Sequence, residues 1–252
     1  NMIVMNIIKT TLKSITALSL AGVLFSCADA PHKSESTEEV QEEIVEEVES
    51  MEEESMDDSY FMMPSPIQIA AMFNRAGLKY EGGITNPTSN VSKYNTKTAR
   101  FLNFGVYSAD LAYAVLNSER QASLDYIKVV RELSDKIGMP AIFDGGKLLT
   151  SFEKNIDNQD SILFILTTIK LRIDDYLAEN NDESKEAVFF AAAWVEGMYL
   201  GSKSSTTQSS ITSRIVEQMS ILSNVIEAVK KQDDPSLELN YLIDGLVKIQ
   251  NH

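Results

Sequence analysis

Residues 106–115 read VYSADLAYAV, and this stretch decides the expected fold. Small and apolar side chains recur every three or four positions without a proline or glycine between them. That spacing is typical of an α-helix, whereas a half-buried strand requires alternation with period two. Gly105, Ala109 and Ala112 form a line of small residues, which lets a second helix approach closely. We therefore expect a helix here that packs tightly against a neighbouring helix.

A second stretch matches the first without a gap. Residues 192–201 read AAWVEGMYLG, which aligns Asp110 with Glu196 and Tyr113 with Tyr199. One interpretation is a duplication that produces two related helical halves packed about a pseudo-two-fold axis. The other is a chance similarity between helices of similar amphipathic composition. The sequence leaves both open.

The chain around these stretches also has helical spacing. We expect helices near 97–117, 119–137, 145–155, 160–180, 183–203, 207–231 and 236–250, with a shorter one before them. The intervening KYEGGITNPTSNVSKYN (79–95) is rich in Gly, Asn, Ser and Pro and predicts a loop. The sequence therefore predicts an all-α domain of about seven to eight helices over residues 59–252.

Several residues mark where these helices begin and end. Ser65, followed by proline, and the acidic residues Asp160 and Asp182 are expected N-caps, because their side chains can accept from exposed backbone N–H groups. Gly77 and Gly138 are expected to end helices, since glycine readily adopts the left-handed conformation found there.

The first 26 residues have the features of a signal peptide. Lys9 and Lys13 precede an apolar run from Ile15 to Phe25, which is shorter than the roughly 20 residues that span a bilayer. Leu24-Phe25-Ser26-Cys27 resembles the lipobox of bacterial lipoproteins, which implies diacylation of Cys27. The alternative is an ordinary secretory signal that is cleaved elsewhere. Cys27 is the only cysteine, so the chain has no disulfide framework.

Residues 27–58 are predicted to be a disordered acidic tether. The stretch from Glu35 to Asp58 has 13 acidic residues and no basic one, in a chain whose net charge is −15. Such a block repels itself and stays extended. The alternative is a docking helix, because Val40, Ile44 and Val48 would share one face. The acidity belongs to this segment and says little about what the helical domain binds.

Four segments of the helical domain resemble an uncharacterised helical lipoprotein family of Bacteroidetes. They read PSPIQIAAMFNRAGLKY, LNFGVYSADLAYAVL, FEKNIDNQDS and AAAWVEGMYLGS, within residues 64–204. The resemblance implies an envelope lipoprotein, held by its lipid in the outer membrane, with the domain in the periplasm or at the surface. It assigns no activity and no catalytic residues.

Five residues of the two matching stretches are the candidates for a pocket or a helix interface: Asp110, Tyr113, Trp194, Glu196 and Tyr199. In one interpretation the two carboxylates converge in a cleft as an acid/base pair with raised pKa values. In the other, which we favour, each carboxylate accepts a hydrogen bond from a tyrosine or a neighbouring helix.

Known catalytic and metal-binding motifs are not found. His32 and His252 lie in the tether and at the last position, so histidine-based catalysis and zinc binding are not expected. DGGKLLTS (144–151) lacks the Ser or Thr of a P-loop, and NIDNQDSILFIL (155–166) lacks the Gly and the Glu of a calcium loop. Residues 59–252 contain 19 basic and 23 acidic residues with no basic stripe, which argues against nucleic-acid binding. We expect no cofactor and no metal.

Three functions remain, in order of preference. The first is a non-enzymatic envelope lipoprotein whose partners are the membrane, through Cys27, and an envelope protein. The second is a small-ligand-binding domain with a pocket between its two halves near Tyr113, Trp194 and Tyr199. The third is an enzyme that relies on carboxylates and tyrosines alone. A closely packed interface between the halves would favour the first, and a concave pocket of several hundred Å³ the second.

Overall fold

The computed structural model describes residues 63–203 and 209–251. The predicted signal peptide (1–26), the lipid attachment at Cys27 and the acidic tether (27–58) lie outside the described residues.

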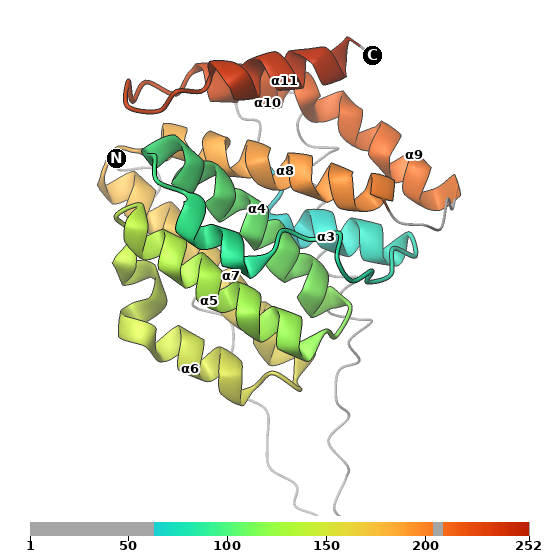
Figure 1. Cartoon of the computed structure of the whole chain (residues 1–252), viewed down its shortest axis with the longest axis vertical. Coiled ribbons are helices and arrows are strands. Elements are labelled where there is room, and N and C mark those ends of the chain that lie inside the picture. The colour runs from blue at the N-terminus through green and yellow to red at the C-terminus, as the bar shows by residue number, and fades with distance from the viewer. Residues whose placement is uncertain (1–62, 204–208, 252) are drawn as a thin grey trace, which may run out of the picture. The chain divides into compact units, whose positions relative to one another are not determined.

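The described part of the chain is all-helical and has no strand, which confirms the predicted class (Figure 1). Its α-helices are α3 (Pro66–Arg75), α4 (Lys97–Leu116), α5 (Arg120–Lys136), α6 (Lys147–Lys154), α7 (Gln159–Glu179), α8 (Glu186–Lys203), α9 (Ser209–Gln218), α10 (Leu222–Lys230) and α11 (Asn240–Gln250). Short 3-10 segments lie at Thr88–Lys93, Pro140–Gly146, Glu183–Lys185 and Met219–Ile221.

Several predicted boundaries are confirmed. The Ser65 side chain accepts from the Gln68 N–H, and the Gln68 side chain accepts from the Ser65 N–H, so that the two residues form a capping box. Pro66 follows at the first helical position. Gly77 and Gly138 both have positive φ just after their helices, a conformation that glycine adopts without strain.

Other boundaries differ from the prediction. Asn158, not Asp160, caps α7, because the Asn158 side chain accepts from the Ser161 N–H. Asp182 precedes a 3-10 turn and makes no side-chain cap bond; it pairs with Lys185 instead. The helix predicted over 207–231 is divided by a 3-10 turn into α9 and α10, and the helix predicted from 236 begins at Asn240.

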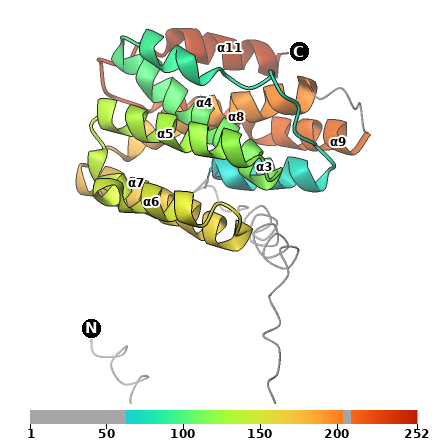
Figure 2. The same cartoon turned by 60° about the horizontal axis from the view of Figure 1, so that its bottom comes forward.

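The core consists of two clusters of buried side chains. One lies among α4, α5, α6 and α7, and the other lies among α3, α8, α9, α10 and α11. Figures 1 and 2 show α6 and α7 on one side and α10 and α11 on the other, with α4 and α8 side by side between them. The contact between α4 and α8 is the most extensive helix pairing in the described residues, so these two helices join the clusters.

Small residues bring α4 and α8 together, as the sequence predicted. A Cβ placed on Gly105 would overlap the carbonyl oxygen of Phe189, and one on Gly197 would contact Ile69 of α3. The backbones of α4 and α8 are therefore in direct contact at Gly105.

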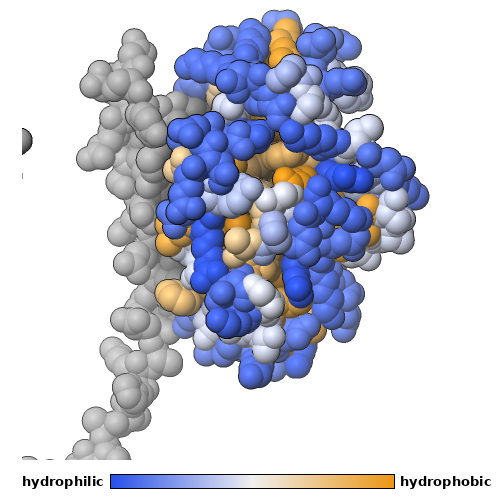
Figure 3. All heavy atoms as spheres, turned by 90° about the vertical axis from the view of Figure 1, so that its left-hand side faces the viewer, coloured by the Kyte–Doolittle hydropathy of each residue, from blue (hydrophilic) through white to orange (hydrophobic). Residues whose placement is uncertain are grey.

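The surface is mostly polar. On the face seen in Figure 3, hydrophobic residues appear only in small areas among hydrophilic ones. Among residues 63–203 and 209–251, no helix has the length and hydropathy needed to cross a bilayer.

Candidate functional site

Asp110 of α4 and Glu196 of α8 meet across the contact between their helices. Asp110 is completely buried and Glu196 is partly buried, and the two carboxyl groups are close enough to form a hydrogen bond. The residues that the sequence alignment paired are therefore spatial neighbours. Two carboxylates in contact repel each other, so one proton held between them stabilises the pair.

The surroundings of Asp110 favour the protonated form of its carboxyl group. Its Oδ2 accepts from the Asn86 backbone N–H at 3.1 Å, whereas no donor among the described residues reaches its buried Oδ1. Burial, and then the charge of Glu196, raise the pKa of Asp110, while burial raises the pKa of Glu196. Asp110 is the more deeply buried and its pKa rises further. The two raised pKa values together mean that the pair as a whole keeps a proton at neutral pH.

Tyrosine hydroxyls attach the loop before α4 to the helices beneath it. Tyr113 donates to the Lys79 carbonyl oxygen at 2.6 Å and accepts from the Glu81 N–H at 2.8 Å. Tyr107 donates to the Pro87 carbonyl oxygen at 2.8 Å. Burial raises the pKa of Tyr113 to about 12, so its hydroxyl stays protonated and remains a donor.

The same loop closes over the carboxyl pair. Tyr126 of α5 donates to Thr85 Oγ1 at 2.7 Å, next to the Asn86 that bonds Asp110. An acid/base role needs a route for substrate to the carboxyl groups. Asp110 has no exposed surface. Only Glu196 of the pair keeps some exposed surface. The two carboxyl groups converge and their pKa values are raised, as in the interpretation that we did not favour from the sequence.

The five candidate residues do not enclose one pocket. Tyr113 and Trp194 are buried side chains of the same core cluster. The indole N–H of Trp194 has no acceptor among the described residues. Tyr199 is exposed on the outer side of α8, where Lys203 Nζ lies 5.8 Å from its ring centre. A pocket that Tyr113 lines has a volume of about 10 Å³, and Trp194, Glu196 and Tyr199 do not line it.

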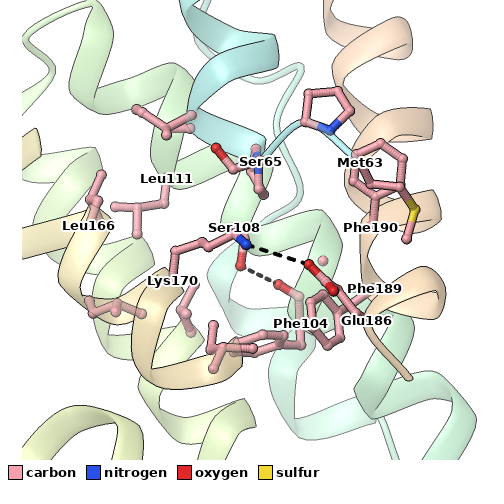
Figure 4. A pocket seen from close by; sticks show the side chains of 18 of the residues that line it. Met63, Ser65, Phe104, Ser108, Leu111, Leu166, Lys170, Glu186, Phe189 and Phe190 are labelled. Carbon is pink, nitrogen blue, oxygen red and sulfur yellow. Dashed lines mark hydrogen bonds and ion pairs between the residues drawn. The ribbon is translucent and has the colours of Figure 1, made fainter. Parts of the chain in front are cut away.

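Another pocket lies elsewhere on α4, where none of the five candidate residues is found. It has a volume of about 90 Å³ and lies between α4, α7 and α8, with the segment that leads into α3 at its rim (Figure 4). Its lining includes Phe104, Leu111, Ile127, Ile169, Ile173 and Phe190. Phe190 belongs to one core cluster and the other five to the other. The pocket is thus a gap at the boundary between the clusters.

Charged side chains lie at the edge of this pocket. Lys170 Nζ is 2.6 Å from Asp174 Oδ2 and 3.6 Å from Glu186 Oε1. Burial raises the pKa of Glu186, and Lys170 opposes that shift. Figure 4 shows the Lys170–Glu186 contact beside Ser108, whose hydroxyl donates to the Phe104 carbonyl oxygen at 2.7 Å.

No group of three or more His, Cys, Asp or Glu side chains is arranged to hold a metal in the parts of the chain that the structure describes. Comparison with protein-family models, curated proteins and solved structures finds no match to this chain. The candidate sites therefore rest on their own geometry.

Proposed function

We propose that this chain is a lipid-anchored outer-membrane protein whose helical domain is a non-enzymatic interaction module. The lipobox-like sequence that ends at Cys27, and the resemblance to a Bacteroidetes lipoprotein family, support the anchor. Two acyl chains on one cysteine hold a protein stably at a membrane, whereas a single chain binds only marginally.

The exposed side of α7 supports the interaction role and is the observation that carries it. Phe164 has 74% of its surface exposed and Leu171 has 57%. They lie seven residues apart, so they share one face of α7, and the exposed Thr167 lies between them. Isolated exposed apolar residues are ordinary. These two lie about two helical turns apart on one face of α7, where a single partner protein can contact both.

Close packing near Tyr113 and Trp194 also favours this function. The alternative from the sequence, a ligand pocket lined by these residues and Tyr199, needs a concave space of several hundred Å³. The space beside Tyr113 is about 10 Å³. The interaction module therefore remains the preferred function, ahead of the ligand-binding domain.

The anchor is tested by labelling cells with a fatty acid. The wild-type chain should incorporate the label and Cys27→Ala should not. Equal labelling of the variant would refute lipidation at Cys27.

The interaction surface is tested by placing a photoreactive amino acid at position 164 or 171 of the full chain in its own envelope. Both positions should crosslink to the same protein. Position 216 is the matched control, because Val216 of α9 is 65% exposed. Phe164→Glu should reduce co-purification of that protein at least ten-fold, and Val216→Glu should not. Crosslinking that is equal at all three positions would reject α7 as the contact surface.

A further inference from the structure

We propose that the pocket between α4, α7 and α8 binds the alkyl chain of a single-chain amphiphile that carries a primary ammonium head. This site lies on the inner side of α7, so it is distinct from the exposed face that carries the proposed function. The proposal does not depend on that function.

The walls of the pocket select an apolar ligand. Side chains from α4, α5, α7 and α8 line it, and nearly all of their exposed atoms are carbon (Figure 4). An apolar cavity of about 150 Å³ stays dry and binds benzene in a well-studied case. A pocket of about 90 Å³ is smaller than that cavity and is open on one side, so it holds only part of a long alkyl chain. A slender alkyl chain that enters from that side fits this form better than a ring system does.

Ser108 and Ala112 of α4 leave space for the pocket, whereas the α8 backbone fills the space beside Gly105. Gly105, Ser108 and Ala112 follow one another at helical spacing and all line the pocket. The Ser108 hydroxyl is already bonded to the Phe104 carbonyl oxygen, so it presents little polarity to a ligand. A longer side chain at position 108 would extend into the pocket.

The rim of the pocket is held in place by local hydrogen bonds. Ser65 lines the rim and is fixed by its reciprocal bonds with Gln68. A ligand therefore meets a preorganised opening, which lowers the entropic cost of binding.

The charged side chains at the edge of the pocket favour a ligand with a positively charged head group. Asp174 and Glu186 carry two negative charges there against the one positive charge of Lys170, whose ammonium group already contacts both carboxylates. A ligand carboxylate would add a third negative charge and would compete for Lys170. A ligand ammonium would balance the excess charge and would donate hydrogen bonds to Glu186.

The test uses three probes of equal chain length, namely decylammonium and decanoate below their critical micelle concentrations and 1-decanol below its solubility limit. Binding to the full chain is measured by calorimetry at pH 7.5. Decylammonium should bind at least ten-fold more tightly than decanoate, with decanol between them. Glu186→Gln should reduce that preference to less than three-fold. Equal affinity for the three probes, or a preference for decanoate, would overturn the proposal.

The position of the site is tested with Ser108→Leu and its matched control Ser213→Leu. Ser213 is exposed on α9 and, like Ser108, donates to the carbonyl oxygen four residues earlier. Ser108→Leu should weaken decylammonium binding at least ten-fold, and Ser213→Leu should leave it unchanged. Equal weakening in both variants, or in neither, contradicts the site.

A second measurement keeps the proposal testable if Ser108→Leu does not fold. A decylammonium analogue with a diazirine at the end of its chain is irradiated with the wild-type chain, and the labelled residues are identified by mass spectrometry. Labels on Leu111, Ile169 or Ile173 support the pocket. Labels confined to residues outside its lining reject it.

Discussion

At the scale of single residues, Asp110 is the most unusual group in the described structure, because a carboxyl without exposed surface normally has a cationic partner. Its neighbour is another carboxyl, Glu196, and the pair is stable only while it keeps a proton. The polar contact between Asp110 of α4 and Glu196 of α8 therefore depends on a bound proton and is not an ion pair.

The pH dependence of stability follows from this arrangement. A carboxyl whose pKa is raised by folding holds a proton that the unfolded chain releases, so its contribution is favourable at acidic pH and declines as the pH rises. The decline begins near pH 4, the ordinary carboxyl range, and extends to about 9 for Asp110. Each proton held in this way changes the free energy of unfolding by about 1.4 kcal/mol per pH unit.

Asp110→Asn should flatten that dependence. An asparagine is neutral at every pH; it still accepts from the Asn86 N–H and can donate to Glu196. Denaturant unfolding at pH 5 and pH 8 should show that the wild type loses more stability between the two values than the variant does. Glu196→Gln should act in the same direction. Parallel pH profiles for wild type and Asp110→Asn would contradict a shared proton.

Tyr113→Phe tests the attachment of the loop to α4. The change removes one donor to Lys79 and one acceptor for the Glu81 N–H, so we expect a loss of about 1–3 kcal/mol and faster hydrogen exchange at the Glu81 amide. Tyr199→Phe is the matched control, because Tyr199 is exposed and such surface changes usually stay within about 0.5 kcal/mol. A similar effect of both substitutions would contradict the role assigned to the Tyr113 hydroxyl.

At the scale of elements, the close approach of α4 and α8 depends on glycine. Gly105→Ala should destabilise the domain by about 1–3 kcal/mol or more, because the new methyl group overlaps the Phe189 carbonyl oxygen. Gly245→Ala on α11 is the control, since its Cβ would meet no atom within 4 Å. That change should instead stabilise by up to about 1 kcal/mol through helix propensity. Thermal unfolding of both variants distinguishes the two effects, and a neutral Gly105→Ala would contradict the tight contact.

The sequence predicted most of the elements, because helical spacing and capping residues are local properties. Ser65 and Gly77 marked the limits of α3 correctly. Asp160 failed as a cap because Asn158, two residues earlier, is equally suited and competes for the same N–H groups. The break between α9 and α10 carries no proline or glycine, so no local signal marked it.

The sites were less predictable than the elements. The aligned helices allowed two interpretations of Asp110 and Glu196, and the convergence of the two carboxyl groups was the one that we did not favour from the sequence. The pocket was not predicted, because a cavity depends on how side chains from distant segments fill space. Ser108 and Ala112 are small residues that are consistent with a pocket, but they are equally consistent with an ordinary contact between two helices. Whether the two halves arose by duplication stays a hypothesis.

At the scale of the whole molecule, the two core clusters differ in how firmly they hold their outer helices. α11 contributes a single fully buried side chain, Leu246, whereas α4 contributes six buried residues to one cluster and two, Phe101 and Tyr113, to the other. Elements with few buried apolar contacts open at lower free energy than the core. We therefore expect α11 to unfold locally while α4 and α8 remain folded.

Hydrogen exchange followed by mass spectrometry measures this difference. Amides of α11 should exchange faster than those of α4, and Leu246→Ala should accelerate α11 alone. Ile127→Ala is the contrasting variant, because Ile127 is fully buried in the cluster around α4 and α5. It should accelerate exchange throughout the domain. Equal protection of α4 and α11 would show that the domain unfolds as one unit.

The buried position of Trp194 has a practical consequence. The chain contains one tryptophan, and it lies without exposed surface on α8, inside the core cluster that also contains Tyr113 of α4. Its indole is shielded from water, so its intrinsic fluorescence should be blue-shifted in the folded protein and should move to longer wavelength when the α4–α8 contact opens. The protein thus carries an optical reporter inside one cluster, on one of the two helices that join the clusters, and the opening of that cluster can be followed in time without an attached dye.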